Sequence, residues 1–304
     1  GIFKLTDFRE QLDYLFDHGF DKGATVGYKQ FDELLNFSQG QLTIITGVPN
    51  SGKSAFLDQI LIRLAQKEEW PIGVCSFENQ PVEKHAANLS ATYVGKSFFV
   101  KDRKMSADEY VTATQFLNKY FFWFKMKDED ISPEGILNRA KQLVRTQGIK
   151  ALVIDPYNYM EHKRNGRATE TEYISGILSD FCNFAKDYAV HVFLVAHPTK
   201  IRKNPVTHDF EVPNLYDISG SAHFFNKADN GFTVYRNRAT NLVTVHVQKV
   251  RFFYNGEIGS ADFNYDVYSG QYTEINDDPF QTPIPDNPRA GIRSVLPPEK
   301  EQPF

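Results

Sequence analysis

The chain has 304 residues, of which 41% are hydrophobic and 24% are charged, proportions typical of a globular protein with a sizeable core. Its net charge of −4 excludes a broad basic surface, so any polyanion must bind to local clusters of positive charge. The sequence contains two cysteines, Cys75 and Cys182, which excludes a disulfide framework. No apolar run reaches the ~18 residues of a membrane-spanning helix. We therefore expect an intracellular protein with no membrane partner.

An amphipathic segment opens the chain. Residues 1–22 carry four apolar side chains at helical spacing, namely Leu5, Phe8, Leu12 and Leu15. Such a stripe must be buried, either on its own domain or on a neighbouring molecule, so we expect a linker helix here. At the other end, residues 275–304 are rich in proline and charge, which predicts a flexible tail.

Between these segments, residues 23–274 alternate between strand-like and helix-like runs. The expected strands span residues 41–46, 71–78, 150–156, 191–198, 231–237 and 242–250. Continuous apolar strands separated by helices predict an α/β fold, with a mostly parallel, twisted sheet flanked by helices. The last two strands follow each other closely, so we expect an antiparallel C-terminal extension. One helix is expected to begin at Ser132 and Pro133 and to end at Gly148.

The most specific motif, GVPNSGKS, follows the first expected strand. A glycine-rich loop of this spacing, placed between a strand and a helix, cradles phosphate with its backbone N–H groups. Lys53 is expected to reach the β- and γ-phosphates, and the Ser54 hydroxyl to coordinate Mg²⁺. We therefore predict a site for ATP, or for another NTP or dNTP, built by Gly47, Val48, Pro49, Asn50, Ser51, Gly52, Lys53, Ser54 and Ala55.

Polar residues end three other expected strands. Asp155 follows the apolar run ALVI and is the expected second metal ligand, because P-loops pair the cation with a strand-terminal carboxylate. Glu78 lies at the sheet edge where ligands bind in α/β folds, and we interpret it as the base that activates water. His197 follows VFLVA and is interpreted as a sensor of the bound phosphates.

These motifs occur in a fixed order together with segments further along the chain, namely SFENQ, LVIDPYN, LVAHPTK, LYDISGSAHFFNKADNGFTVYR and VQKVRFFYNGEIG. In this order they resemble the RecA-like motor domain of DnaB-type hexameric replicative helicases, a family that includes Twinkle and the phage primase-helicases. The resemblance extends over residues 20–272 and implies a RecA-like P-loop NTPase core. It further implies a hexameric, ATP-dependent motor that moves 5′ to 3′ on single-stranded DNA and unwinds a replication fork.

The resemblance also implies partners and a compartment. Homo-oligomerisation, single-stranded DNA, and a primase or polymerase are the expected partners. We expect the cytoplasm of a bacterial or phage-infected cell, with a mitochondrion as the alternative if the chain is a fragment of a longer protein. The N-terminal helix is expected to dock on an adjacent subunit, as the family's linker helix does, and packing on its own domain is the alternative.

Four residues receive nucleotide-binding roles from the resemblance. It implies that Glu78 activates water and that His197, where the DnaB pattern has Gln, senses the γ-phosphate. Arg236 and Phe263 match family positions that hold the nucleobase between a guanidinium and a ring. A position in the core is the alternative for Phe263.

Lys249 and Arg251 form a further pair. Strand alternation places both side chains on one face, and two neighbouring cations repel unless an anion lies between them. The resemblance implies that this pair acts on the nucleotide of the adjacent subunit. An ion pair of Arg251 with Glu257 or Asp262 is the alternative.

DNA contacts are expected from loops on the ligand side of the sheet, where HKRNGR and KIRK concentrate positive charge. The predicted contacts are Lys200, Arg202 and Lys203, together with Gly220 and Ser221 from the segment that the resemblance places at the DNA channel. Two other functions share the same core: a RecA- or RadA-like recombinase that forms filaments, and a non-motor NTPase switch. The KVR pair and the DISGSA segment favour the helicase motor.

Overall fold

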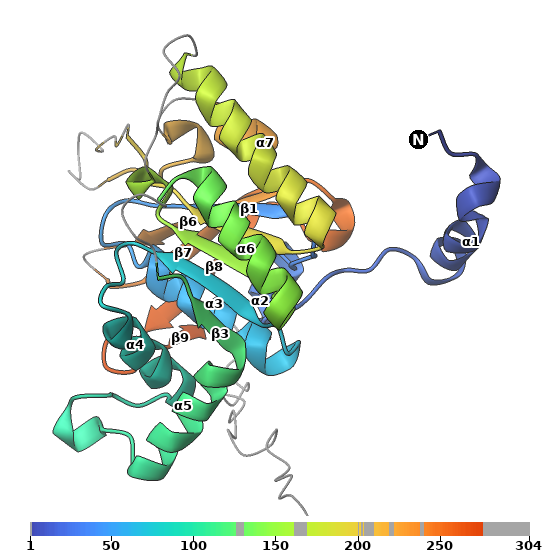
Figure 1. Ribbon diagram of the computed structural model, residues 1–304. Coiled ribbons are helices and arrows are strands. Elements are labelled where there is room, and N and C mark those ends of the chain that lie inside the picture. Colours follow the sequence, from blue (N-terminus) through green and yellow to red (C-terminus); the bar gives the residue numbers. More distant parts are fainter. Residues whose placement is uncertain are drawn as a thin grey trace, which may run out of the picture.

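The computed structural model describes residues 2–125, 131–160, 169–199, 201, 203, 210–218, 222–237 and 240–275. Its described part is organised around a nine-stranded sheet with the strand order β3-β2-β4-β5-β1-β6-β7-β8-β9 (Figure 1). The strands are β1 Leu42–Thr46, β2 Ile72–Ser76, β3 Phe121–Trp123, β4 Ala151–Asp155, β5 His191–Val195, β6 Asn230–Arg236, β7 Val243–Val250, β8 Gly259–Tyr265 and β9 Tyr272–Glu274.

The sheet has a parallel and an antiparallel part. All pairs among β1 to β6 are parallel, whereas β6 to β9 pair antiparallel in chain order. The predicted α/β fold with an antiparallel C-terminal extension is therefore confirmed. Strands β3, β8 and β9 were not expected. The first and last have only three residues each, and β8 alternates between buried and exposed positions, so none shows the continuous apolar run of a central strand.

The helices are α1 Arg9–His18, α2 Lys29–Leu34, α3 Lys53–Lys67, α4 Val82–Val94, α5 Ala107–Tyr120, α6 Pro133–Gln147, α7 Glu170–Tyr188 and α8 His223–Lys227. The expected boundaries of α6 are confirmed. The Ser132 hydroxyl accepts a hydrogen bond from the Gly135 N–H at 3.1 Å, and Gly148 ends the helix with φ of 64°.

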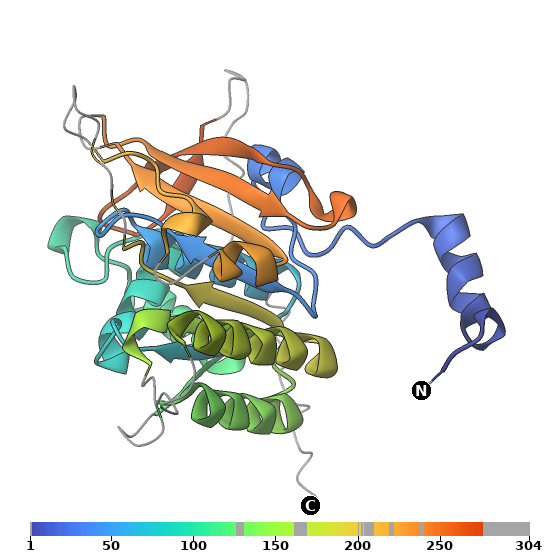
Figure 2. The same cartoon turned by 90° about the horizontal axis from the view of Figure 1, so that it is seen from above.

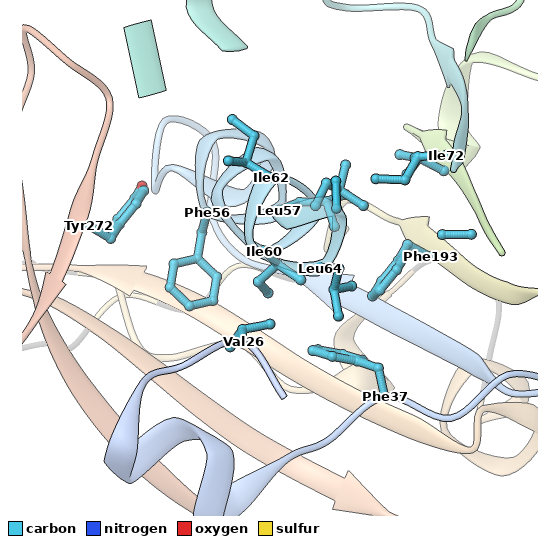
Figure 3. Close-up of a cluster of buried hydrophobic side chains, with 14 of the residues drawn as sticks. Val26, Phe37, Phe56, Leu57, Ile60, Ile62, Leu64, Ile72, Phe193 and Tyr272 are labelled. Atoms are coloured by element: carbon cyan, nitrogen blue, oxygen red, sulfur yellow. The ribbon is translucent and has the colours of Figure 1, made fainter. Parts of the chain in front are cut away.

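Helices cover both faces of the sheet. Strand β1 shows the reason, because Leu42 and Ile44 pack into a cluster with α6 and α7, while Ile45 packs into a second cluster with α3, α4 and α5. Figure 3 shows this second cluster, where Phe56 and Ile60 of α3 lie close to Val26. The central strands are buried on both faces, as their unbroken apolar runs predict.

Helix α1 stands apart from this body in both views (Figures 1 and 2). None of its residues is buried, and Leu12 is 41% exposed. Leu5, Phe8 and Leu12 therefore do not pack on their own domain, whereas Leu15 is partly buried and lines a pocket with Phe37 and Trp70. The expected tail, from residue 276 onward, lies outside the described residues. Among the described helices, none combines the length and apolarity needed to cross a membrane.

Candidate active site

The carboxyl ends of four parallel strands meet at one edge of the sheet. Strand β1 runs into the GVPNSGKS loop, β2 leads to Glu78, β4 ends at Asp155 and β5 leads to His197. This is the edge at which ligands bind in open α/β sheets. The residues expected to handle phosphate and metal are therefore brought together by topology.

Two glycines shape the loop. Gly47 has φ of 152°, and a Cβ atom there would collide with the Val234 carbonyl oxygen. Gly52 has φ of 94°, in the left-handed region that favours glycine, and a Cβ atom would meet the Tyr272 hydroxyl at 2.5 Å. That hydroxyl donates a hydrogen bond to the Gly52 carbonyl at 3.2 Å. The loop backbone is thus held close to its neighbours, with no room for side chains at either position.

Lys53 begins α3 directly after this loop and is buried. Its Nζ donates to the carbonyl oxygens of Gly47 at 3.0 Å and Val48 at 3.1 Å. Burial lowers the pKa of Lys53, and the charges of Asp155 and Glu78 oppose that shift. An ammonium group desolvated inside a glycine-rich loop is suited to an anionic ligand.

Ser54 and Asp155 form the metal side of the site. The Ser54 hydroxyl donates to the Asp155 carboxylate, which is 2% exposed. Burial raises the pKa of Asp155 to about 6, with the charges of Asp58 and Glu78 adding to the shift and the Ser54 bond opposing it. Oδ1 of Asp155 is buried without a hydrogen-bond partner. A buried, unpartnered carboxylate oxygen beside a hydroxyl fits the oxygen ligands that Mg²⁺ prefers.

The described residues contain no cluster of three or more His, Cys, Asp or Glu side chains arranged to hold a metal. A cation bound by Ser54 and Asp155 would therefore take further ligands from phosphate and water, as Mg²⁺ commonly does.

Glu78 and His197 lie beside each other above the loop. His197 Nε2 lies 3.4 Å from Glu78 Oε1, and the His197 backbone N–H donates to Asn158 Oδ1 at 2.9 Å. Burial lowers the pKa of His197; the charge of Lys53 adds to this effect and that of Glu78 opposes it. The ring is therefore neutral at pH 7, and a neutral imidazole still carries one N–H to donate.

The base-binding prediction needs a correction at Phe263. This ring is fully buried, and it packs edge-on against Tyr28 and Phe56, so it has no face free for a nucleobase. Two residues further along the same face of β8, Tyr265 is partly exposed. The Arg236 guanidinium lies over the Tyr265 ring at 5.8 Å. The aromatic partner of Arg236 is Tyr265 rather than Phe263.

Lys249 and Arg251 lie at the opposite end of the sheet. The Arg251 Nη1 donates to Asp229 Oδ1 at 2.7 Å, and its side chain is 47% exposed. Lys249 Nζ donates to the carbonyl oxygens of Phe225 and Asn226. Arg251 thus forms an ion pair within its own chain, as in the alternative considered for it, but the carboxylate is Asp229 rather than Glu257 or Asp262.

Asp229 fixes Arg251 to the first strand. Its Oδ2 accepts from the Leu42 N–H at 3.0 Å, and its backbone oxygen accepts from the Arg251 N–H at 2.9 Å. Leu42 is the first residue of β1, and the phosphate loop follows the last. Four residue steps of strand separate these ends by about 13 Å, so Arg251 lies away from the loop of its own chain.

Of the expected DNA contacts, only Lys203 is described. It is exposed, forms an isolated β-bridge with Phe210 and places its Nζ 5.2 Å from that ring. Lys200, Arg202, Gly220 and Ser221 lie outside the described residues, as does the HKRNGR loop at 162–167.

Sequence reasoning missed Tyr265 and Asp229. A usable signal existed for Asp229 alone. Tyr265 has the same strand parity as Phe263 and stands at the strand's end, whereas Asp229 is the acidic residue immediately before the run NGFTVYR.

Comparisons with known proteins agree with this geometry. The chain is 40% identical over 287 residues to the Twinkle homolog protein, chloroplastic/mitochondrial, of Arabidopsis thaliana, a match that covers 90% of this chain and 40% of that protein. It is 31% identical over 160 residues to a probable plasmid replicative DNA helicase of Chlamydia psittaci, covering 50% of this chain and 34% of that protein. The chain thus spans less than half the length of these two relatives.

Solved structures share the fold. The ATPase domain of G40P superposes with a TM-score of 0.71 at 17% identity, covering 91% of this chain and all of that one. A DnaB-like replicative helicase, described with its interactions with primase, gives a TM-score of 0.70 at 17% identity over 91% of this chain and 68% of that chain. The family model described as DnaB-like helicase C terminal domain matches residues 23–276. The chain therefore belongs to the DnaB-like helicase C-terminal domain family.

Proposed function

We propose that this chain is the motor of a ring-shaped DNA helicase, which hydrolyses ATP or another NTP at the contacts between subunits, moves along single-stranded DNA and unwinds a replication fork. The observation that carries the proposal is the separation of Arg251 from the phosphate loop. The phosphate-binding loop follows one end of β1. At the other end lies the half-exposed guanidinium of Arg251, which is bound by the buried Asp229 carboxylate. A second copy of the chain is then needed to complete each site.

In this function each residue at the loop has a defined task. Lys53 binds the β- and γ-phosphates, and Ser54 and Asp155 hold Mg²⁺, which supplies charge neutralisation on the phosphate oxygens. Glu78 accepts the proton of the attacking water. The neutral His197 donates a hydrogen bond to the γ-phosphate, and Arg251 of the neighbouring subunit contacts the same group from the other side, where its planar fork binds several oxygens.

Ring assembly gives the exposed stripe of α1 a partner. A groove of about 570 Å³ between α4 and α5 is lined by apolar side chains that include Phe98, Phe99 and Leu117, and Phe99 is 72% exposed. We infer that α1 of one subunit packs into this groove on the next. In sedimentation experiments Leu12→Asp should abolish the hexamer, whereas Glu10→Gln, on the opposite side of the same helix, should leave it intact. Equal hexamer populations in both variants would contradict this docking.

DNA is expected to bind through phosphate contacts rather than base readout. We infer that Lys200, Arg202 and Lys203 contribute, with Gly220 and Ser221 facing the strand. On single strands the slope of log K against log salt changes by about 0.7 per phosphate contact. Replacing Lys200 and Lys203 with Ala should flatten the slope while nucleotide affinity stays the same. An unchanged slope would assign the contacts to the segment around residues 217–229.

The decisive experiment compares the motor with its alternatives. Electron microscopy with Mg²⁺ and a nonhydrolysable nucleotide should show closed six-membered rings, and a forked substrate should be unwound in the presence of ATP. Filaments with strand exchange would favour a recombinase, and hydrolysis without unwinding would favour a switch. We further infer a primase or polymerase as a partner, and the cytoplasm of a bacterial or phage-infected cell, or an organelle such as the mitochondrion, as the compartment.

A further inference from the structure

A buried polar chain runs behind the metal side of the site. His85 of α4 is 2% exposed and lies between Asp58 of α3 and Trp123 of β3. Its Nε2 lies 3.0 Å from Asp58 Oδ1, and its Nδ1 accepts a hydrogen bond from the Trp123 indole N–H at 3.2 Å. The two rings meet edge to face at 6.3 Å. Three elements far apart in sequence thus join one hydrogen-bonded chain.

The donor and acceptor of each hydrogen bond follow from the chemistry of the three side chains. An indole N–H only donates, so Nδ1 of His85 accepts, and the ring proton of the neutral form lies on Nε2 and points to Asp58. Burial lowers the pKa of His85, but the charge and hydrogen bond of Asp58 outweigh it and raise the pKa above its ordinary value. In either protonation state Nε2 carries a proton and donates it to Asp58. The orientation of the Asp58 carboxylate is therefore the same in both states.

Asp58 lies on the metal side of α3. It follows Ser54 by four residues, so the two side chains share one face of the helix, one turn apart. Its charge raises the pKa of Asp155, whereas that of His85 lowers it, which places both groups within electrostatic reach of the strand-terminal carboxylate. The Asp58 side chain is 14% exposed, so water reaches it even though its partner His85 is buried.

We propose that Asp58 is a positioning residue of the Mg²⁺ site: held by His85 and Trp123, it accepts a hydrogen bond from a water molecule in the hydration shell of the cation that Ser54 and Asp155 bind. Mg²⁺ usually keeps several of its waters in proteins, and carboxylates in the outer shell orient such ligands. The chain from Trp123 to Asp58 supplies the rigidity that this role needs. The inference rests on the proposed function, in which Ser54 and Asp155 hold the cation.

The test measures how nucleotide binding depends on Mg²⁺, without measuring hydrolysis. A fluorescent ATP analogue is titrated into the protein in EDTA and then at increasing Mg²⁺ concentrations. Loss of an outer-shell partner typically weakens metal affinity about 10–100-fold. Asp58→Asn and His85→Leu should therefore raise the half-saturating Mg²⁺ concentration by about 10-fold or more, with binding in EDTA unchanged. His85→Gln, whose amide still donates to Asp58, should restore most of the Mg²⁺ affinity.

Controls separate the outcomes. Ser90→Ala removes a buried hydroxyl from α4, the helix of His85, and leaves the hydrogen bonds among Trp123, His85 and Asp58 intact. Its Mg²⁺ dependence should match that of the unmodified protein. If Asp58→Asn, which is nearly isosteric, leaves the Mg²⁺ dependence unchanged, the inference is wrong. If Asp155→Asn also leaves it unchanged, the metal assignment of the proposed function fails first. If nucleotide binding is weakened equally in EDTA and in Mg²⁺, the hydrogen bonds among Trp123, His85 and Asp58 have a purely structural role, and the inference is also wrong.

Discussion

The two ends of the parallel strands differ in how their buried carboxylates are satisfied. At the carboxyl end, Ser51 Oγ, Asp155 Oδ1 and His197 Nε2 are buried without a hydrogen-bond partner. At the amino end, Asn230 Oδ1 is also buried without a partner, but both carboxylate oxygens of Asp229 accept hydrogen bonds, and the Arg251 guanidinium bound by Oδ1 is half-exposed. Since a buried carboxylate oxygen without a partner costs free energy, we infer that the first end binds a ligand. In the proposed function the second end contacts another subunit.

In the proposed function, this difference is how a single chain carries both halves of a site that is divided between subunits. A ligand-binding end tolerates unsatisfied atoms because the ligand satisfies them. At the other end, Asp229 binds both the backbone N–H and the guanidinium of Arg251, and the guanidinium remains half-exposed. Experiments that exchange or remove groups at each end test this assignment.

The largest effect is expected at the ligand-binding end. Lys53→Ala should abolish nucleotide binding in calorimetric titrations, because the loop contains no other cation to contact the phosphates. Lys67→Ala is the matched control, since Lys67 ends the same helix and, among the described residues, donates to Thr25 Oγ1. Retained binding by Lys53→Ala, or an equal loss with Lys67→Ala, would contradict the assignment.

Mixing experiments test the division itself. An arginine supplied from outside is worth about 10³–10⁵ in rate in related NTPases, and removing a general base costs about 10²–10⁴. Arg251→Ala and Glu78→Gln should each be nearly inactive, and mixed rings of the two should recover ATPase activity at interfaces where both groups are intact.

The control for this experiment mixes Glu78→Gln with Lys53→Ala. Both substitutions affect the same half of the site, so no interface in a mixed ring is complete. ATPase activity should therefore stay absent. Recovery in this control, or no recovery in verified rings of the first pair, would argue against a site shared between subunits.

Asp155 offers a smaller effect on stability. Burial raises its pKa to about 6 from the ordinary 3.8, so folding favours the protonated form. The associated stabilisation is complete below about pH 4 and is lost as the pH rises through about 6, a difference of roughly 3 kcal/mol. In EDTA, Asp155→Asn should therefore raise the free energy of unfolding at pH 7.5 and change it little at pH 4. Asp187→Asn, an exposed carboxylate, should show no such pH dependence.

The smallest effect distinguishes two aromatic residues on one strand. Stacking on a base is worth about 1–3 kcal/mol, so Tyr265→Leu should weaken nucleotide affinity about 5- to 150-fold with little change in stability. Phe263→Leu should do the reverse and lower the free energy of unfolding by about 1 kcal/mol. If Phe263→Leu weakens nucleotide affinity more than Tyr265→Leu does, Tyr265 is not the ring that stacks on the base.

Much of the ligand-binding end follows from sequence because each of its residues adjoins a recognisable strand. Apolar runs precede the phosphate-binding loop and also Glu78, Asp155 and His197. Parallel strands bring their carboxyl ends to one edge of the sheet. The choice between Phe263 and Tyr265 was not available, because both have the same strand parity and only the packing of Phe56 and Tyr28 shows which is enclosed. The bond between Arg251 and Asp229 depends on the register of β6 and β7, which includes an irregularity after Gly231.

Trp123 has a spectroscopic consequence. Its indole N–H donates to His85 behind the metal side, while its ring also lines the groove between α4 and α5. The sequence contains two tryptophans, and the other, Trp70, is buried in the core. A Trp70→Phe protein would therefore emit from Trp123 alone. Its emission should respond separately to cation binding on one side of the ring and to a helix entering the groove on the other, which makes the protein its own fluorescent reporter of both events.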